Sequence, residues 1–219
     1  MQKAVIFDMD GVIADTQIIH ASVASNMLRD VGIVVDPDII SYKYAGVSYP
    51  TMFREIFDQS GIQKGVEEIV AKTRSTALKA LQETEIVPLP GALELIQICL
   101  ENGFATAIAS SSRFAMIDTV LNKLGLTGKF HAIASGEEVK RGKPDPEIFL
   151  LAAQRISINP QNCVVIEDSY HGMFGAKSAG MKCIGLIRDG DFDRGYPADL
   201  LVKNLHEVSV GTILDILGQ

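Results

Sequence analysis

The sequence contains few cysteines, no long apolar run and fewer basic than acidic residues. Cys99, Cys163 and Cys183 lie in apolar segments and lack the spacing of metal ligands, so we expect buried, reduced thiols in a cytoplasmic protein. No apolar stretch is long enough to cross a bilayer, which argues against a membrane partner. The apolar run after Lys3 reaches Asp8 too soon for a secretory signal, and we expect no signal peptide.

Basic residues number 20 against 27 acidic ones, which gives a formal net charge of −7. This charge disfavours nucleic acid and anionic membranes as main partners. A small anionic substrate remains compatible with it, because a cation bound in a pocket can reverse the local field. The 219 residues allow one large domain or two unequal ones. We see no repeat, and a monomer is the default expectation.

Most of the chain alternates between short apolar runs and amphipathic helical patterns. Strands are predicted at 3–7, 104–109, 130–134, 163–166, 182–187 and, more briefly, near 199–202. Helices are predicted at 91–101, 113–124, 146–156 with Asp145 as its cap, from Ser169 to Gly180, and at 206–217. The alternation predicts an α/β fold, a doubly wound parallel sheet with a Rossmann-like core.

The stretch between the first two strands has helical periodicity throughout. Its predicted helices run from Asp15 or Thr16 to Gly32, over 37–44, from Ser48 and Pro50 onward, and over about 64–84. We therefore predict a Rossmann-like core of residues 1–14 and 89–219 and an inserted helical cap of residues 15–88. The ends of the cap must lie close together for the sheet to continue. A cap over the carboxyl ends of the strands would exclude water when it closes.

Chemically reactive side chains gather where the predicted strands end. They are Asp8, Asp10, Ser110, Lys143, Glu167 and Asp168. Because parallel strands end at one edge of a sheet, we expect these side chains to converge. Clustered carboxylates suit Mg²⁺, and a lysine with a serine hydroxyl suits a phosphate. An aspartate beside Mg²⁺ stays ionised and can attack phosphorus, while a second one can transfer protons.

Four segments, in this order, resemble the four motifs of the haloacid dehalogenase superfamily. They are Asp8-Met9-Asp10-Gly11-Val12, the apolar strand that ends in Ser110, Lys143-Pro144, and Glu167-Asp168-Ser169. Within this superfamily the chain is similar to the phosphatases and phosphomutases that carry a helical cap after the first motif. An aspartate at position 10 favours phosphoryl transfer over dehalogenation.

The resemblance implies a role for each matched residue. Asp8 would be the nucleophile that forms an aspartyl-phosphate, and Asp10 would be the general acid and base. Ser110, its neighbour Ser111 and Lys143 would bind the phosphate. The implied magnesium ligands are Asp8, the carbonyl oxygen of Asp10, Asp168 and Glu167. Glu167 has an alternative role, which is to orient Asp168 or a water molecule.

Four further residues are candidates for contacts with the substrate or the cap. Thr16 and His20, like Gly46-Val47-Ser48, resemble positions of beta-phosphoglucomutases, and Arg113 follows the serines. Where the mutase pattern has an arginine for the second phosphate, this chain has Tyr49, although Arg54 lies one helical turn further on. The simpler interpretations are helix caps for Thr16 and for Ser111 or Ser112, packing for His20 and Tyr49, and a solvated charge for Arg113.

We therefore predict a Mg²⁺-dependent phosphatase that acts on a small phosphorylated metabolite, with a sugar phosphate as the expected substrate. The first alternative is a beta-phosphoglucomutase-like enzyme that returns the phosphoryl group to another hydroxyl. The second is a receiver-like signalling module with a long-lived aspartyl-phosphate. The predicted cap and the acid/base role of Asp10 disfavour the signalling module, because Asp10 would hasten loss of the phosphoryl group.

Overall fold

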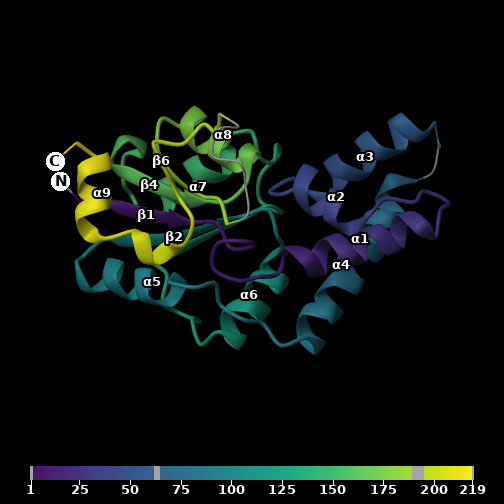
Figure 1. The fold of residues 1–219 in the computed structure, drawn as a ribbon, viewed down its shortest axis with the longest axis horizontal. Coiled ribbons are helices and arrows are strands. Elements are labelled where there is room, and N and C mark those ends of the chain that lie inside the picture. Colours follow the sequence, from purple (N-terminus) through teal and green to yellow (C-terminus); the bar gives the residue numbers. More distant parts are fainter. Residues whose placement is uncertain (1, 62–64, 189–194, 219) are drawn as a thin grey trace.

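The computed structural model describes residues 2–61, 65–188 and 195–218 and consists of a parallel sheet flanked by helices, with a further layer of helices beyond it (Figure 1). The sheet has six strands in the order β3-β2-β1-β4-β5-β6. The strands are β1 (Ala4–Phe7), β2 (Ala105–Ser110), β3 (Ala132–Ser135), β4 (Cys163–Glu167), β5 (Lys182–Leu186) and β6 (Leu200–Val202). All pairings are parallel, which confirms the predicted doubly wound α/β fold.

The strands are buried on both faces, as their continuous apolar sequences require. In β1, the side chains of Val5 and Phe7 belong to one apolar cluster, and those of Ala4 and Ile6 belong to the other. The helices that follow the sheet strands are α5 (Ala92–Glu101), α6 (Phe114–Lys123), α7 (Glu147–Arg155), α8 (Tyr170–Ser178) and α9 (Val210–Ile216). The strand order reverses at β1, so the crevice at its carboxyl end is where such a sheet binds a ligand.

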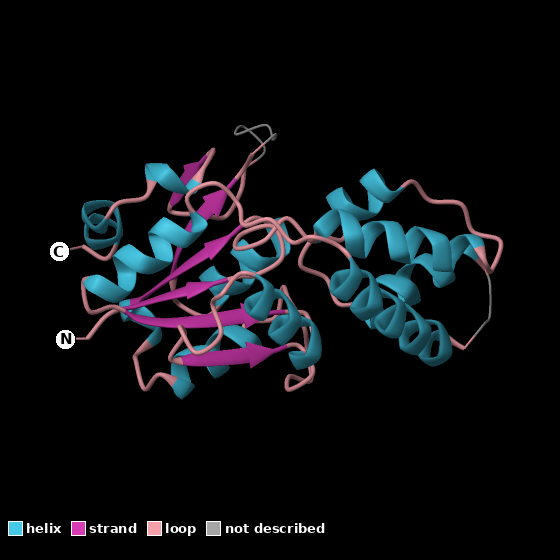
Figure 2. Cartoon of the chain, turned by 90° about the horizontal axis from the view of Figure 1, so that it is seen from below, coloured by secondary structure: helices cyan, strands magenta, loops and turns pink. Residues whose placement is uncertain are grey.

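Residues 15–88, called the helical segment below, contain four helices. These are α1 (Gln17–Arg29), α2 (Pro37–Lys43), α3 (Tyr49–Ser60) and α4 (Val66–Glu83). Figure 2 shows the strands pointing with their carboxyl ends toward this segment. Its two ends cross side by side, because Ala14 and Pro88 form an antiparallel bridge and the Leu89 amide donates to the Ile13 carbonyl at 3.0 Å. The predicted domain boundaries lie at this crossing, and the division into two domains stays a prediction.

Several predicted helix ends differ from the structure. The helix expected over 206–217 is a short 3₁₀ turn (Leu205–Glu207) followed by α9, because Ser209 accepts the Thr212 amide at 3.1 Å and starts a new helix there. At α7 the capping position is Pro146, although Asp145 Oδ1 still accepts the Glu147 amide at 3.1 Å. The start expected near residue 64 lies outside the described residues.

Of the helix caps predicted near the site, one was placed correctly and one was wrong. Thr16 occupies the capping position of α1, although its side chain makes no cap hydrogen bond, whereas Arg113, rather than Ser111 or Ser112, occupies the capping position of α6. The hydroxyls of Thr16, Ser111 and Ser112 make other hydrogen bonds, as described below. By contrast, the three cysteines are free and buried as predicted. None of the described helices is both long and apolar enough to span a membrane.

Candidate active site

Asp8 directly follows β1 and stays in register with the sheet, since its amide donates to the Ile166 carbonyl at 3.0 Å. The chain then turns back, and the amides of Ile13 and Ala14 both donate to the Met9 carbonyl, at 2.9 and 3.0 Å. Gly11 makes this turn with φ +90°, and a Cβ there would overlap the carboxylate of Asp168. The glycine therefore lets the first loop lie directly against the end of β4.

Lys143 is the central cation of the site. Its Nζ donates to Asp8 Oδ1 at 2.6 Å and to Glu167 Oε1 at 2.7 Å, and all three side chains are buried. The other oxygen of Glu167 accepts from the amide and the hydroxyl of Ser169, at 2.8 and 2.9 Å. Because both of its oxygens have partners, Glu167 is placed to orient Lys143.

Burial raises the pKa of Asp8 to about 7, since the ion pair with Lys143 only partly offsets the desolvation and the repulsion from Glu167 and Asp10. The pKa of Lys143 is also raised, which in a lysine favours the charged form. Burial opposes its charge, yet the neighbouring carboxylates of Asp8 and Glu167 raise its pKa above the usual value. The site therefore holds one fixed cation among more acids than it can neutralise, which favours the binding of a further cation.

Asp10 has a different environment from Asp8, two residues before it. Its Oδ1 accepts the Thr16 hydroxyl at 2.5 Å, and its Oδ2 accepts the hydroxyls of Ser112 at 2.8 Å and Ser110 at 3.4 Å. Nε2 of His20 lies 3.3 Å from Oδ1. Burial opposes ionisation of Asp10, but His20 and these hydroxyls lower its pKa to about 2. Asp10 is thus held as an anion that can accept a proton.

His20 connects Asp10 to α3. Its Nδ1 lies 2.7 Å from the hydroxyl of Tyr49, while Nε2, which faces Asp10, has no hydrogen-bond partner among the described residues. Burial and the negative charge of Asp10 raise the pKa of Tyr49, so its hydroxyl remains neutral. The predicted contact residues Thr16, His20 and Tyr49 are therefore brought together in front of Asp10.

Two other predicted contact residues are engaged elsewhere in this structure. The hydroxyl of Ser111 donates to the Gly46 carbonyl at 2.7 Å, which joins the end of β2 to the helical segment. Arg113 forms an ion pair with Glu137 at 2.5 Å, and Glu137 also accepts the Phe114 amide at 3.2 Å. Roles for Ser111 and Arg113 in phosphate or substrate binding stay predictions.

Asp8, Glu167 and Asp168 form a group that could hold a metal ion, with one carboxylate oxygen from each within 4.8 Å of the others. Oδ1 of Asp168 is buried and has no hydrogen-bond partner among the described residues. Oδ2 accepts a hydrogen bond from the side-chain nitrogen Nε2 of Gln17 at 2.5 Å. Burial and the charges of Glu167 and Asp8 raise the pKa of Asp168. Hard oxygens, crowded negative charge and an unsatisfied carboxylate oxygen fit a divalent cation such as Mg²⁺.

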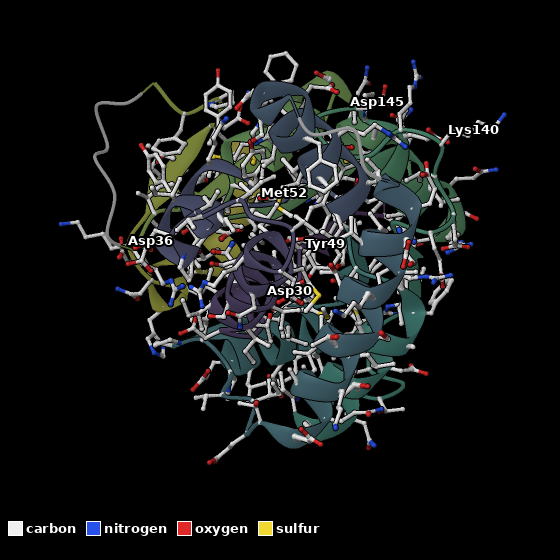
Figure 3. The ribbon with its side chains drawn as sticks, turned by 90° about the vertical axis from the view of Figure 1, so that its right-hand side faces the viewer. Asp30, Asp36, Tyr49, Met52, Lys140 and Asp145 are labelled. Atoms are coloured by element: carbon white, nitrogen blue, oxygen red, sulfur yellow. The ribbon has the colours of Figure 1, made fainter. Side chains whose placement is uncertain are left out.

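A cavity of about 710 Å³ lies between the sheet edge and the helical segment. Asp8, Asp10 and Lys143 line it from the sheet side, and His20 and Tyr49 line it from the helical segment. Figure 3 looks onto the helical segment, with Tyr49 near the middle of the view and Lys140 and Asp145 toward its edge. The basic residues around this cavity are Arg54, Arg74, Arg113, Lys140, Arg141 and Lys143. A small anionic molecule fits this size and charge.

Two residues of the site were not predicted from the sequence. Ser112 donates to Asp10, but in a run of three serines the sequence does not show which hydroxyl points to the acid. Gln17 contacts Asp168, which lies 151 positions further along the chain, and no motif marks it. The only signal was its position directly after Thr16, at the start of a predicted helix beside the site.

Comparisons with known proteins add a family and several relatives. A family model described as haloacid dehalogenase-like hydrolase matches residues 5–186. Hexitol phosphatase B of Escherichia coli K12 is 30% identical over 222 residues, which cover 98% of this chain and 96% of the relative. Beta-phosphoglucomutase of Bacillus subtilis is 31% identical over 217 residues, which cover 95% and 92%. The crystal structure of beta-phosphoglucomutase from Clostridium difficile has a TM-score of 0.88 at 29% identity and covers 100% and 98%.

These relatives include a phosphatase and phosphomutases at similar levels of identity. Overall similarity therefore does not separate the two activities. The distinction depends on the residues that surround Asp10 and on those that could hold a second phosphate.

Proposed function

This chain belongs to the haloacid dehalogenase-like hydrolase family, as its four motifs predicted, and within the phosphatases and phosphomutases of that family we propose that it is a Mg²⁺-dependent phosphatase. The proposed substrate is a small phosphorylated metabolite, and a sugar phosphate is the class we favour. The family membership leaves the signalling-module alternative without support.

The observation that carries the proposal is the pairing of Tyr49 with His20 in front of Asp10. A phosphomutase must hold a bisphosphate at both ends while it turns round, which requires a cation for the second phosphate. Where the mutase pattern has an arginine for this role, the present chain has Tyr49, whose neutral hydroxyl is bonded to His20. The contact with His20 also favours the anionic form of Asp10, which can accept a proton from water.

In the proposed first step, an oxygen of Asp8 attacks phosphorus and the bond from phosphorus to the ester oxygen breaks. The leaving oxygen takes a proton from Asp10, so the reactive complex is the one in which Asp10 is protonated, although its contacts in the free protein favour the anion. In the second step, water attacks the phosphorus of the aspartyl-phosphate and gives a proton to Asp10, which restores the Asp8 carboxylate and the acid form of Asp10. Lys143, 2.6 Å from Asp8, would neutralise charge on the phosphoryl oxygens.

Mg²⁺ would be held by Asp8, Asp168 and the carbonyl oxygen of Asp10, with Glu167 orienting Lys143. A bound Mg²⁺ supplies positive charge that stabilises the phosphoryl group during transfer. Residues 15–88 would act as a cap that excludes bulk water, and Arg54 and Arg74 on this segment would contact the rest of the substrate. Ser110 lies within 3.4 Å of Asp10 and would bind the transferred phosphate.

A phosphomutase is the second candidate, because beta-phosphoglucomutases are among the relatives and Arg54 and Arg74 line the same cavity. The two activities are separated by measuring phosphate release and isomer formation on a panel of hexose, hexitol and pentose phosphates with Mg²⁺. We expect release to exceed isomer formation, with and without a bisphosphate activator. Isomer formation faster than release would favour the mutase.

Asp8→Asn tests the nucleophile in the same assay. A carboxamide cannot form the aspartyl-phosphate, so we expect phosphate release to fall by about 10⁴-fold or more. Asp118→Asn, on the exposed side of α6, is the matched control and should keep the wild-type rate. Circular dichroism confirms folding, and a folded Asp8→Asn protein with substantial activity would refute the role of Asp8.

A further inference from the structure

Gln17 is the first residue of α1 and reaches from the helical segment into the acidic group. Its Nε2 lies 2.5 Å from Asp168 Oδ2 and 3.4 Å from the carbonyl oxygen of Asp10. Both neighbours are acceptors, so the amide nitrogen, with its two hydrogens, must face them. The amide oxygen points to α2, where it accepts the Ser41 hydroxyl at 3.5 Å.

Asp168 has no ion pair within the described part of the chain. Lys143 is bonded to Asp8 and Glu167, and Arg188 is paired with Asp15 at 3.1 Å. Among the described residues, the side-chain amide of Gln17 is therefore the donor that Asp168 has, and it satisfies only one of the two carboxylate oxygens. A neutral amide compensates a buried carboxylate less well than a cation does, which makes this contact replaceable.

Gln17 contacts Oδ2 of Asp168 and the carbonyl oxygen of Asp10, and both residues are among the ligands proposed above for Mg²⁺. An amide nitrogen has no free lone pair and its hydrogens repel a cation, so Nε2 and the ion cannot occupy the same place. Gly11 leaves the space for this arrangement, because a Cβ there would overlap both the Asp168 carboxylate and the Gln17 amide.

We propose that Gln17 is a displaceable substitute for the divalent cation, so that its amide holds Asp168 and the Asp10 carbonyl in the metal-free protein and leaves when the ion binds. This inference rests on the proposed Mg²⁺-dependent function. Gln17 belongs to α1 and contacts α2, so its hydrogen bond to Asp168 joins the helical segment to the sheet. When the ion binds, this hydrogen bond is lost and Asp168 contacts the ion at the edge of the sheet instead. Metal affinity is therefore set partly by the helical segment.

The test uses Mn²⁺ as the probe, with free Mn²⁺ measured by electron paramagnetic resonance, and Mg²⁺ as the competitor. We expect Gln17→Ala to bind both ions about three- to tenfold more tightly than wild type, because the ion no longer has to break a hydrogen bond to a charged group. Gln17→Leu, which keeps the side-chain volume, should behave in the same way. Gln97→Ala removes a similar glutamine–carboxylate contact on α5 and should leave the affinity unchanged.

Thermal unfolding in EDTA and in saturating Mg²⁺ supplies a second readout. Without metal, Gln17→Ala should have a lower Tm than wild type, because Asp168 loses its donor; with Mg²⁺ the two proteins should have the same Tm. Equal lowering under both conditions with unchanged affinity would make Gln17 merely structural and would overturn the proposal. Weaker Mn²⁺ binding would show that Gln17 supports the bound ion, which also overturns it.

These outcomes are separable from failure of the proposed function. If wild-type protein binds Mn²⁺ and Mg²⁺ and releases phosphate, but Gln17 variants bind as wild type does, only the role of Gln17 is refuted. If the wild-type protein binds neither ion, the proposed Mg²⁺ dependence is refuted together with it.

Discussion

At the scale of single residues, two aspartates in one loop have opposite surroundings. Asp8 is buried beside Lys143 and near other acids, and its pKa rises to about 7, whereas Asp10 accepts three hydroxyls and faces His20, and its pKa falls to about 2. Pairs of carboxyls whose environments separate their pKa values are typical of sites where one acts on the substrate and the other transfers protons. The geometry therefore suits a division of roles between neighbours.

His20→Ala should change the pH dependence of turnover. Asp10 must give up its proton in the first step and be anionic to take a proton from water in the second, and His20 favours the anion. Without His20, burial is less opposed and the pKa of Asp10 rises, so kcat should begin to fall at a higher pH as the solution is acidified. The measurement is the pH profile of kcat for phosphate release in wild type and in His20→Ala. Groups that titrate equally in both proteins do not contribute to the difference between the two profiles.

His206→Ala, at an exposed position of the 3₁₀ turn before α9, is the control and should keep the wild-type profile. A His20→Ala profile that coincides with that of wild type would show that His20 does not control the ionisation of Asp10.

At the scale of elements, the site is made by the ends of three neighbouring strands and by the first turn of α1. β1 supplies Asp8, β2 supplies Ser110, and β4 supplies Glu167, while Thr16 and Gln17 come from the chain entering the helical segment. The loop after β1 can approach β4 only because Gly11 has no side chain. The backbone of this loop is therefore as important to the site as the carboxylates.

Gly11→Ala should destabilise the protein by about 2–4 kcal/mol, because it combines a left-handed φ with overlap of the Asp168 carboxylate. Gly103→Ala has a similar φ of +74° and no atom within 4 Å of the added Cβ, so it measures the cost of the backbone conformation alone, about 1 kcal/mol. Urea unfolding gives both free energies. Equal losses in the two variants would mean that the loop after β1 does not depend on close contact with Asp168.

At the scale of the whole molecule, two stretches of the chain that run side by side connect the sheet layer to the helical segment (Figure 1). A few side-chain contacts also join these two layers. One such contact is Lys123 on α6, whose Nζ donates to the carbonyls of Gln82 and Thr84 at the end of α4, at 2.7 and 2.6 Å. The cavity lies between the two layers, so ions and substrates that bind there contact both. We therefore expect ligand binding to depend on the position of the helical segment relative to the sheet.

Mg²⁺ should stabilise the whole molecule, because an ion bound to Asp8 and Asp168 relieves repulsion that exists only in the folded state. At an ion concentration of 100 times Kd, the gain is about 2.7 kcal/mol. For a protein of this size that gain raises Tm by about 5–10 °C. Asp168→Asn should abolish most of the shift, and Asp118→Asn should keep it. A Tm that is the same in Mg²⁺ and in EDTA would contradict a metal site in this group.

The sequence by itself determined the parallel sheet, the order of its elements and the family. Apolar runs that end in acids, alternating with amphipathic helices, define strands buried on both faces, and four motifs in order identified the superfamily. Local patterns are sufficient here because the strand period and the helix period are properties of neighbouring residues. Helix caps were predicted less well, since Thr16 and Ser112 donate to Asp10 and Ser111 donates to Gly46, partners that are distant in sequence.

Only the tertiary structure decided which atoms face one another at the site. It brings Tyr49 against His20, turns both oxygens of Glu167 toward Lys143 and Ser169, and places Gln17 on Asp168. These contacts join residues from different elements, and they depend on how the helical segment lies over the sheet edge. The sequence could therefore name the acids of this site, whereas their charge states and hydrogen-bond partners follow from the packing of the two layers.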